Sequence, residues 1–301
     1  MGSFLALGEC MVEIAPADGS LCRQGFAGDT FNAAWYARRA LPAGWTVDFA
    51  TQVGCDAVSD AMLGFMAGEG VGTGSILRRE DRTVGLYLIS LKNGERSFSY
   101  WRGQSAARMI ADDPAWLAQV LGGRRVIHFS GITLAILPPA GRVALCAALQ
   151  QARAGGALVS FDTNLRPRLW ESADAMRAGL TMGASVADVV LPSFDEETGL
   201  FGDATPQATA ARYGAGGARM VAVKNGGEPL TLWTPDSVAQ LAAVPVPHVV
   251  DTTAAGDSFA GVFLAGLATG RPLAEAAGVA MQVAARVIQA RGALVPAAVT
   301  G

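Results

Sequence analysis

The stretch ALVSFDTNLRPRLWESADAMRAGLTMGASVADVVLPS, residues 157–193, contains the pattern that decides the fold. An apolar run ends in the polar residues Asp162 and Asn164, an Ala-rich amphipathic segment spans 172–184, and a second apolar run ends at Ser193. A strand, a helix and a second strand in this order are typical of a βαβ unit, in which the two strands lie parallel in one sheet.

The same alternation recurs along the whole chain. Further apolar runs that predict strands are SFLALGE (3–9), TVDFATQVG (46–54), RVIHFSG (125–131) and RMVAVKNGG (219–227). Segments that predict helices are 29–40, 57–69, 138–154, 205–214, 255–269 and 272–290. We therefore expect an α/β fold with a doubly wound, mostly parallel sheet, formed by residues 1–301 as one domain. In such sheets ligands bind outside the carboxyl ends of the strands.

One region departs from this pattern. Residues 82–102 predict two strands joined at Asn93-Gly94, because Asn-Gly between β-rich runs is a strong hairpin signal. Phe98, Tyr100 and Arg102 share one parity of the second strand. An aromatic face with an arginine suits a flap over a polar ligand, whereas the alternative is that these aromatic side chains only cover the sheet or a dimer partner.

The composition excludes several classes of protein. The chain has 301 residues, of which 51% are hydrophobic and 16% charged, and its net charge of −3 gives no basic surface for nucleic acid. The longest stretch without a charged residue, 126–141, contains Pro138 and Pro139, so we do not expect it to span a membrane. No positive region precedes the first apolar run, and the four cysteines lack a CxxC spacing, which together favour a cytoplasmic protein with reduced thiols.

The segment DTTAAGDSFAG, residues 251–261, places two carboxylates and several small residues where a helix is expected to begin, near Ala255. The first amides of a helix have no intrahelical partner, so those near Gly256 can bind an anion without a lysine or arginine. Asp257 would then lie beside the anion, where a carboxylate can accept a proton from an attacking hydroxyl. The alternative is ordinary helix capping by aspartate and small residues.

Residues 26–40, FAGDTFNAAWYARRA, contain a second Gly-Asp-Thr turn at the start of a helix. Asp29 and Asn32 would share one face of that helix, where their side chains can bind the hydroxyl groups of a sugar. A capping aspartate followed by a buried asparagine would give the same pattern.

Two loops after predicted strands carry cations. In FDTNLRPRLW, 161–170, Arg166 can bind a carboxylate or phosphate through its bidentate guanidinium, although a solvated basic loop is the alternative. In VAVKNGGE, 221–228, Lys224 precedes two glycines and suits a nucleotide phosphate, but this motif is weak. The P-loop pattern and GxGxxG after the first strand are both absent, which argues against P-loop NTPases and dinucleotide oxidoreductases.

Together these segments resemble the ribokinase-like (PfkB) carbohydrate kinases. DTTAAGDSFAGVFLAG is similar to the C-terminal signature of that family, and AGDTFNAAWYARR to its N-terminal Gly-Gly-Asp-x-x-Asn segment, with Ala27 in place of the first glycine. Within the family the likeness is nearest to the kinases that act on 2-keto-3-deoxygluconate. It rests on LGECMVEIAP, RQGFAGDTFN, GERSFSYWR, FSGITLAILPP and FDTNLRPRLW, and spans residues 5 to about 260.

The resemblance implies an enzyme that uses ATP and Mg²⁺ to phosphorylate the terminal hydroxyl of 2-keto-3-deoxy-D-gluconate. Asp257 would be the base, and the amides of Ala254, Ala255 and Gly256 would form the anion hole. The residues implied for the sugar acid are Gly28, Asp29, Asn32, Tyr87, Tyr100, Arg102 and Arg166. The residues implied for the nucleotide are Asn164, Ser193, Lys224, Gly226 and Gly227.

The resemblance also implies a β lid formed by about 9–27 and 82–103, and a homo-oligomer built through it. Many relatives carry an Asn-x-x-Glu element linked to magnesium, where this chain has SFDE at 193–196. Magnesium is therefore expected to come with ATP and water, with Glu196 as an outer contact, while Asp251 is either a structural residue or a contact to magnesium through water. A kinase for keto-deoxygalactonate, fructose, ribose or a nucleoside, and a sugar-binding regulator without activity, remain the alternatives.

Overall fold

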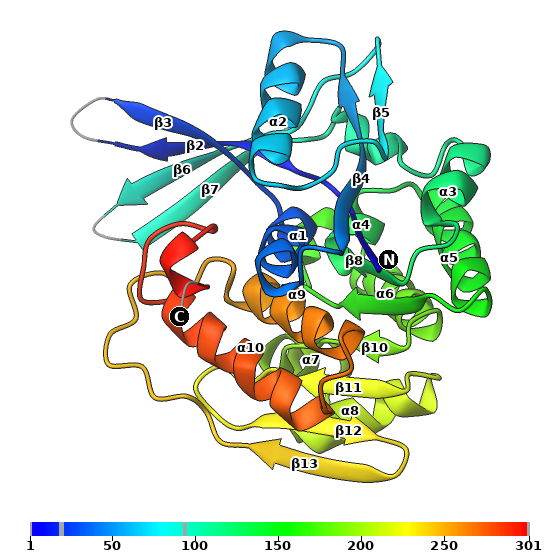
Figure 1. Ribbon diagram of the computed structural model, residues 1–301, viewed down its shortest axis with the longest axis vertical. Helices are drawn as coiled ribbons and strands as arrows, with labels where there is room; N and C mark the ends of the chain where they lie inside the picture. The colour runs from blue at the N-terminus through cyan, green and yellow to red at the C-terminus, as the bar shows by residue number, and fades with distance from the viewer. Residues whose placement is uncertain (1, 18–20, 93–94, 300–301) are drawn as a thin grey trace.

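The computed structural model describes residues 2–17, 21–92 and 95–299, and nine strands within these ranges form one sheet (Figure 1). The seven strands from β11 to β5 are parallel, and β12 and β13 extend one edge in antiparallel fashion. The order across the sheet is β13 (Ser237–Leu241), β12 (Leu230–Thr234), β11 (Met220–Val223), β10 (Val189–Val190), β9 (Leu158–Asp162), β8 (Val126–Ser130), β1 (Ser3–Leu7), β4 (Thr46–Gly54) and β5 (Ile76–Arg79).

Helices cover both faces of this sheet, because the side chains of its strands alternate between two apolar clusters. On β1, Phe4 and Ala6 pack with one set of helices, and Leu5 and Leu7 pack with the other. The first set is α1 (Asp29–Ala40), α2 (Ala57–Gly68), α9 (Ala255–Ala268) and α10 (Leu273–Val287). The second set is α3 (Pro114–Leu121), α4 (Gly131–Ala135), α5 (Pro139–Ala154), α6 (Ala173–Ser185) and α8 (Pro206–Ala215). The doubly wound α/β architecture predicted from the sequence is thus confirmed.

The remaining helical elements are short, and they lie in the connections between strands or, in one case, after α10. They are α7 (Phe194–Phe201) and the 3₁₀ turns Ala106–Met109, Pro167–Leu169 and Pro296–Ala298. In the part of the chain that the structure describes, no helix combines the length and apolar character needed to cross a membrane. Cys10, Cys22, Cys55 and Cys146 are all free thiols.

A second sheet of four strands stands off from the main body beside α2 (Figure 1). Its order is β3 (Cys22–Ala27), β2 (Met11–Pro16), β6 (Leu86–Lys92) and β7 (Glu95–Trp101). β2 pairs antiparallel with β3 and parallel with β6, and β6 pairs antiparallel with β7. The turn predicted at Asn93-Gly94 lies outside the described residues. The ring of Phe26 lies 5.5 Å from that of Phe65 on α2, so one face of this sheet packs against the main body.

Candidate active site

The amino end of α9 begins with an unusual backbone conformation at Ala254. This residue precedes the helix with φ +61°, in the left-handed region, which costs a residue with a Cβ about 1–2 kcal/mol. No side chain among the described residues caps the helix. The amide of Ala255 donates to the carbonyl of Thr252 at 3.2 Å, so this member of the predicted anion hole already has a partner. Strain of this kind at a helix start is typical of functional sites.

Asp257 lies in the first turn of α9, as predicted, and its carboxyl is perturbed. Burial raises its pKa from 3.8 to about 7, and the nearby charge of Asp29 adds to this rise. The Nδ2 atom of Asn32 donates to Oδ2 of Asp257 at 2.8 Å, which lowers the pKa in part. A carboxylate that titrates near neutrality can accept a proton at physiological pH and release it again, as a general base must.

Further polar contacts near this aspartate join α1 to the segment after β9, and the end of β9 to the segment after β11. Asn164, which has φ +32°, donates from Nδ2 to Oδ2 of Asp29 at 2.8 Å. Lys224 donates from Nζ to both oxygens of Asp162, at 3.0 and 2.8 Å. A Cβ on Gly256 would lie 3.2 Å from Nζ of Lys224, so the missing side chain lets this cation approach the start of α9. Sequence reasoning assigned no role to Asp162, although its place at the carboxyl end of a predicted strand was the available signal.

The predicted sugar residues on α1 are held next to α9 by close helix packing. A Cβ on Gly261 would lie 2.2 Å from the carbonyl of Ala33, so the two backbones are in contact at this point. This packing brings Asn32, which is 225 residues distant in the chain, to the side of Asp257. Gly28 precedes α1 in an extended conformation, and a Cβ there would lie 2.1 Å from the carbonyl oxygen of Glu9. Only glycine fits this position.

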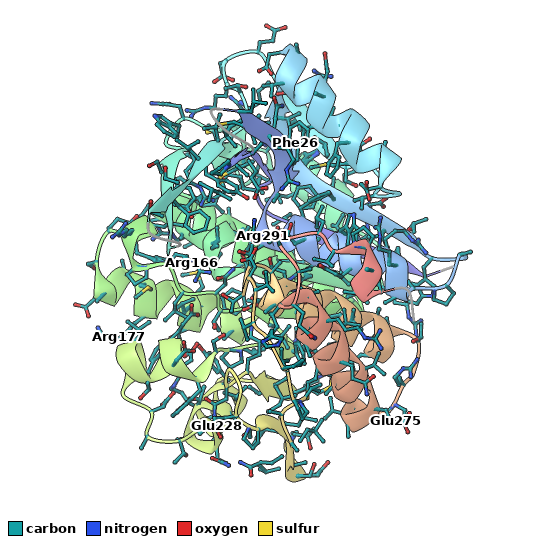
Figure 2. The ribbon with its side chains drawn as sticks, turned by 90° about the vertical axis from the view of Figure 1, so that its left-hand side faces the viewer. Phe26, Arg166, Arg177, Glu228, Glu275 and Arg291 are labelled. Atoms are coloured by element: carbon teal, nitrogen blue, oxygen red, sulfur yellow. The ribbon has the colours of Figure 1, made fainter. Side chains whose placement is uncertain are left out.

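Arg166 is half exposed and paired with a carboxylate. Its Nη1 donates to Oε1 of Glu196 at 2.9 Å, and Oε2 of the same glutamate accepts from the amide of Leu165 at 3.1 Å. Burial raises the pKa of Glu196, and the charge of Arg166 opposes that rise. In the view of Figure 2, Arg166 lies at mid-height toward the left side of the molecule, below Phe26 of the four-stranded sheet.

The predicted nucleotide residues lie on neighbouring segments. Ser193 precedes α7 and pairs with Lys224 through a single parallel bridge. Gly226 and Gly227 lie in the connection between β11 and β12, where Gly226 has φ +56° and both have open space at the Cβ position. Open backbone next to a lysine fits the approach of a polyphosphate.

The described residues hold no group of three or more acidic, histidine or cysteine side chains that could ligate a metal ion. Asp251 accepts hydrogen bonds from the amide and hydroxyl of Thr253, at 3.1 and 2.7 Å, and from the amide of Gly292, at 2.8 Å. These contacts tie the segment before α9 to the segment after α10.

The four-stranded sheet presents an aromatic face that reaches the start of α9. Tyr87 and Tyr100 are opposite one another in the ladder with ring centroids 5.9 Å apart, and Phe98 stacks on Tyr100 at 6.2 Å. Tyr87 is buried in one cluster with Ala254, whereas Tyr100 is 52% exposed. The hydroxyl of Tyr87 donates to Glu13, and burial together with that carboxylate raises the pKa of the phenol.

Arg102, predicted to bind the sugar acid, is buried and forms an ion pair with Glu9. Sequence reasoning did not predict this partner. The signal was again positional, because Glu9 follows β1 at the carboxyl edge of the main sheet, where polar residues gather.

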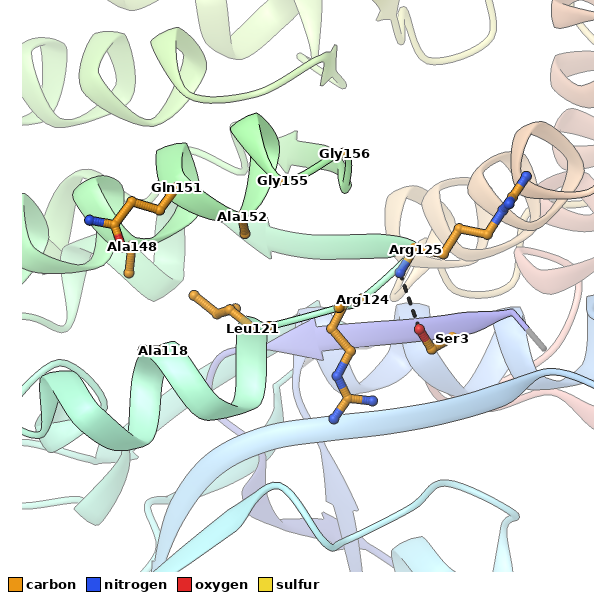
Figure 3. Close-up of a pocket in the computed structure, with 12 residues that line it drawn as sticks. Ser3, Ala118, Leu121, Arg124, Arg125, Ala148, Gln151, Ala152, Gly155 and Gly156 are labelled. Atoms are coloured by element: carbon orange, nitrogen blue, oxygen red, sulfur yellow. Dashed lines mark hydrogen bonds between the residues drawn. The ribbon is translucent and has the colours of Figure 1, made fainter.

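A cavity of about 460 Å³ lies at the opposite, amino end of strands β1, β8 and β9 (Figure 3). Ser3, Arg125 and Gly156 line it, and the amide of Arg125 donates to Oγ of Ser3 at 3.1 Å. Arg124 also lines it, but its guanidinium is paired with Asp48. This cavity is separate from the residues around Asp257, which lie at the carboxyl ends of the strands.

The sequence is similar to a known protein family along almost its whole length. The family model described as pfkB family carbohydrate kinase matches residues 3–299. A 2-dehydro-3-deoxygluconokinase of Escherichia coli K12 is 37% identical over 297 residues, with 96% of each chain covered. A Haemophilus influenzae protein of the same name is 35% identical, with coverage of 96% of this chain and 94% of the relative.

Solved structures agree with this result. The PfkB protein of Polaromonas sp. JS666 has a TM-score of 0.83 and 29% identity, with 96% of each chain covered. A fructokinase of Xylella fastidiosa, solved with bound ATP, has a TM-score of 0.81 and 25% identity over 97% of this chain and 93% of that structure.

Proposed function

We infer the activity of this chain from its family: it belongs to the PfkB carbohydrate kinases, whose family model covers residues 3–299. The reaction we propose is the ATP-dependent phosphorylation of 2-keto-3-deoxy-D-gluconate, also called 2-dehydro-3-deoxygluconate, at its terminal hydroxyl. The product is 2-keto-3-deoxy-6-phosphogluconate. Four relatives at 35–37% identity over 96% of the chain, each named 2-dehydro-3-deoxygluconokinase, support this substrate.

The observation that carries the proposal is the carboxyl of Asp257, which has a pKa of about 7 at the start of α9. Its carboxylate accepts the proton of the sugar hydroxyl, and the oxygen of that hydroxyl forms a bond to the γ-phosphorus of ATP. The bond between this phosphorus and the bridging oxygen breaks, and ADP leaves. The hydrogen bond from Asn32 holds the carboxylate in one orientation during proton transfer.

The start of α9 supplies the positive field that the migrating phosphoryl group needs. The amides of the first helical turn, which include those of Gly256 and Asp257, lack the intrahelical acceptors that later residues have, and this end of a helix favours an anion. Lys224, which reaches this point because Gly256 has no side chain, places its ammonium group here while it stays paired with Asp162. Fixed donors of this kind stabilise the charge that develops on the phosphoryl oxygens.

The carboxylate of the sugar acid distinguishes this substrate from a neutral sugar. Arg102 on the four-stranded sheet and Arg166 after β9 are the two guanidinium groups that can bind it. Tyr87 and Tyr100 lie on the same face as Arg102 and supply apolar contact and hydroxyl groups over the sugar. The four-stranded sheet would thus act as a lid, closing over a substrate held from below by Asp29 and other residues of α1.

ATP fits the segment around Ser193, Asn164 and the two glycines after Lys224, since open backbone is available there. Mg²⁺ would come bound to the phosphates of ATP, where it neutralises their charge. Glu196 is near enough to Arg166 and the β9 loop to act as an outer contact through water. We assign Asp251 a structural role, because three donors of the chain already occupy it.

The decisive experiment is a coupled assay of ADP release with saturating MgATP and a panel of acceptors. The panel contains the keto-deoxy acids derived from gluconate and galactonate, together with fructose, ribose and adenosine. We expect the highest kcat/KM for 2-keto-3-deoxygluconate. Equal or higher kcat/KM for ribose, fructose or adenosine would refute the assignment, and binding without ADP release would point to a regulator instead.

We also propose a cytoplasmic homo-oligomer built through the lid. Its last strand exposes Trp101, which is 60% exposed and has the opposite parity to Tyr100, so this side chain is available for burial against a second copy. Trp101→Glu should shift the protein to a smaller assembly by light scattering, whereas Val143→Glu, an exposed residue on α5, should not. An unchanged mass for the Trp101 variant would contradict the proposed interface.

A further inference from the structure

The ion pair between Glu9 and Arg102 lies where the chain passes between the main sheet and the lid. Glu9 follows β1 and precedes β2, so it marks the entry into the lid, and Arg102 directly follows β7, so it marks the return. Both side chains are almost completely buried, with exposures of 2% and 8%. The two remaining passages, at Gly28 and Gly85, lie against the same glutamate.

The packing around this pair leaves the carboxylate of Glu9 little freedom. A Cβ on Gly85 would lie 2.8 Å from Oε1 of Glu9 and 3.2 Å from Cβ of Arg102, so two residues of the lid enclose it. The guanidinium of Arg102 also lies 5.9 Å from the ring centroid of Tyr100. Arg102 is therefore close to both an anion and an aromatic ring.

Several polar atoms of this ion pair lack a hydrogen-bond partner among the described residues. Within the residues that the structure describes, neither oxygen of Glu9 has a well-aligned hydrogen bond, and Nε of Arg102 has no acceptor. The contact between the two groups is a close ion pair through Nη2. A guanidinium has five N–H donors, so this pairing leaves donors of Arg102 for a second carboxylate. A buried and incompletely bonded charge is costly unless a ligand completes it.

We propose that Glu9 is a positioning residue for substrate recognition: it anchors Arg102 at the root of the lid so that the remaining donors of this arginine bind the carboxylate of the sugar acid. Glu9 touches neither the sugar nor the nucleotide in this proposal. It keeps a buried cation in place when the site holds no substrate, and it links substrate binding to the position of the lid. The proposal rests on the proposed function, since it requires an acidic substrate.

The test is a double-mutant cycle with Glu9→Gln, Arg102→Ala and the double variant, in which KM for 2-keto-3-deoxygluconate and KM for ATP are measured separately. Glutamine keeps the size of the side chain but not its charge. We expect Glu9→Gln to raise KM for the sugar acid about tenfold or more, with KM for ATP unchanged. In the Arg102→Ala background the same change should have an effect of less than about twofold, because Glu9 acts through that arginine.

The matched control is Glu69→Gln, which removes the charge of another glutamate paired with an arginine, Arg39, outside the strands of the lid. It should leave both KM values unchanged. A KM for the sugar acid within about twofold of wild type in Glu9→Gln, or an equal rise in both backgrounds, would overturn the proposal.

A second measurement keeps this inference separate from the proposed function. If the wild-type protein releases no ADP with the sugar acid, the proposed function has failed, and Glu9 is then judged by hydrogen exchange in the ligand-free protein. Loss of the anchor should speed amide exchange in residues 11–16 and 97–101 of Glu9→Gln but not of Glu69→Gln. Unchanged exchange in both variants would refute the anchoring role as well.

Discussion

Replacing Asp257 by asparagine should make the protein more stable at neutral pH while it removes catalysis. The pKa of this carboxyl rises from 3.8 to about 7 on folding. Each pKa unit is worth about 1.4 kcal/mol, so ionised Asp257 destabilises the folded state by about 4 kcal/mol above pH 7. Asparagine carries no charge and its Oδ1 can still accept the hydrogen bond from Asn32, so most of this destabilisation should disappear.

The sign of the pH dependence is specific to a raised pKa. Below about pH 4 the carboxyl of Asp257 is protonated in both the folded and the unfolded state, so its ionisation costs the wild type nothing. Between pH 4 and 7 the unfolded state ionises first, and the free energy of unfolding of the wild type falls by about 1.4 kcal/mol per pH unit through this group. Above pH 7 both states are ionised and the difference between the two proteins is constant.

The assay is urea unfolding of wild type and Asp257→Asn at pH 5, 6, 7 and 8, together with kcat at pH 7.5. The stability advantage of the variant should grow by roughly 2 kcal/mol or more from pH 5 to pH 7, and kcat should fall about 10²-fold or more. Asp174→Asn, at a side chain that is 92% exposed, is the control and should change neither quantity. A stability difference that is the same at pH 5 and pH 8, or a variant with near wild-type kcat, would refute the reasoning.

A pH profile and two substitutions test other features of the structure. The kcat/KM for the sugar acid should rise with pH and reach half its maximum near pH 7, as Asp257 ionises in the free enzyme; a flat profile from pH 6 to 8 would exclude it as the titrating base. Gly28→Ala should cost about 2 kcal/mol or more in urea unfolding, because its Cβ would clash with the carbonyl of Glu9, whereas Gly44→Ala, with nothing within 4 Å, should cost little. Glu197→Ala should destabilise the protein by about 3 kcal/mol or more, because this fully buried carboxylate accepts hydrogen bonds from an arginine and a tyrosine; a loss below about 1 kcal/mol would contradict the importance of that network.

The sequence was sufficient for the elements of the fold because their signals are local. The helix predicted over 29–40 is α1, Asp29–Ala40, and the helix predicted over 255–269 is α9, Ala255–Ala268. Apolar periodicity and the small residues at helix starts depend on neighbours along the chain, so they can be recognised without the tertiary structure. The same holds for the position of Asp257 in the first turn of its helix.

The electrostatic state of the candidate site could not be predicted in this way. The pKa of Asp257 depends on Asp29 and Asn32, which are more than 200 residues away in sequence, and on the burial that their packing creates. The ion pair of Arg102 could not be predicted for the same reason, since its partner Glu9 is 93 residues distant. Long-range pairs of this kind leave no periodic signal in the chain.

The lid is connected by the chain to the rest of the enzyme at the four passages near Glu9, Gly28, Gly85 and Arg102, so it forms a separate module. Strands between these passages can accumulate changes in the side chains that we propose lie over the sugar, while the start of α9 and its charges stay as they are. Substrate range and catalytic power can therefore evolve on separate segments of one gene. For protein engineering, exchange of lid strands between kinases of this family should keep these four root positions intact.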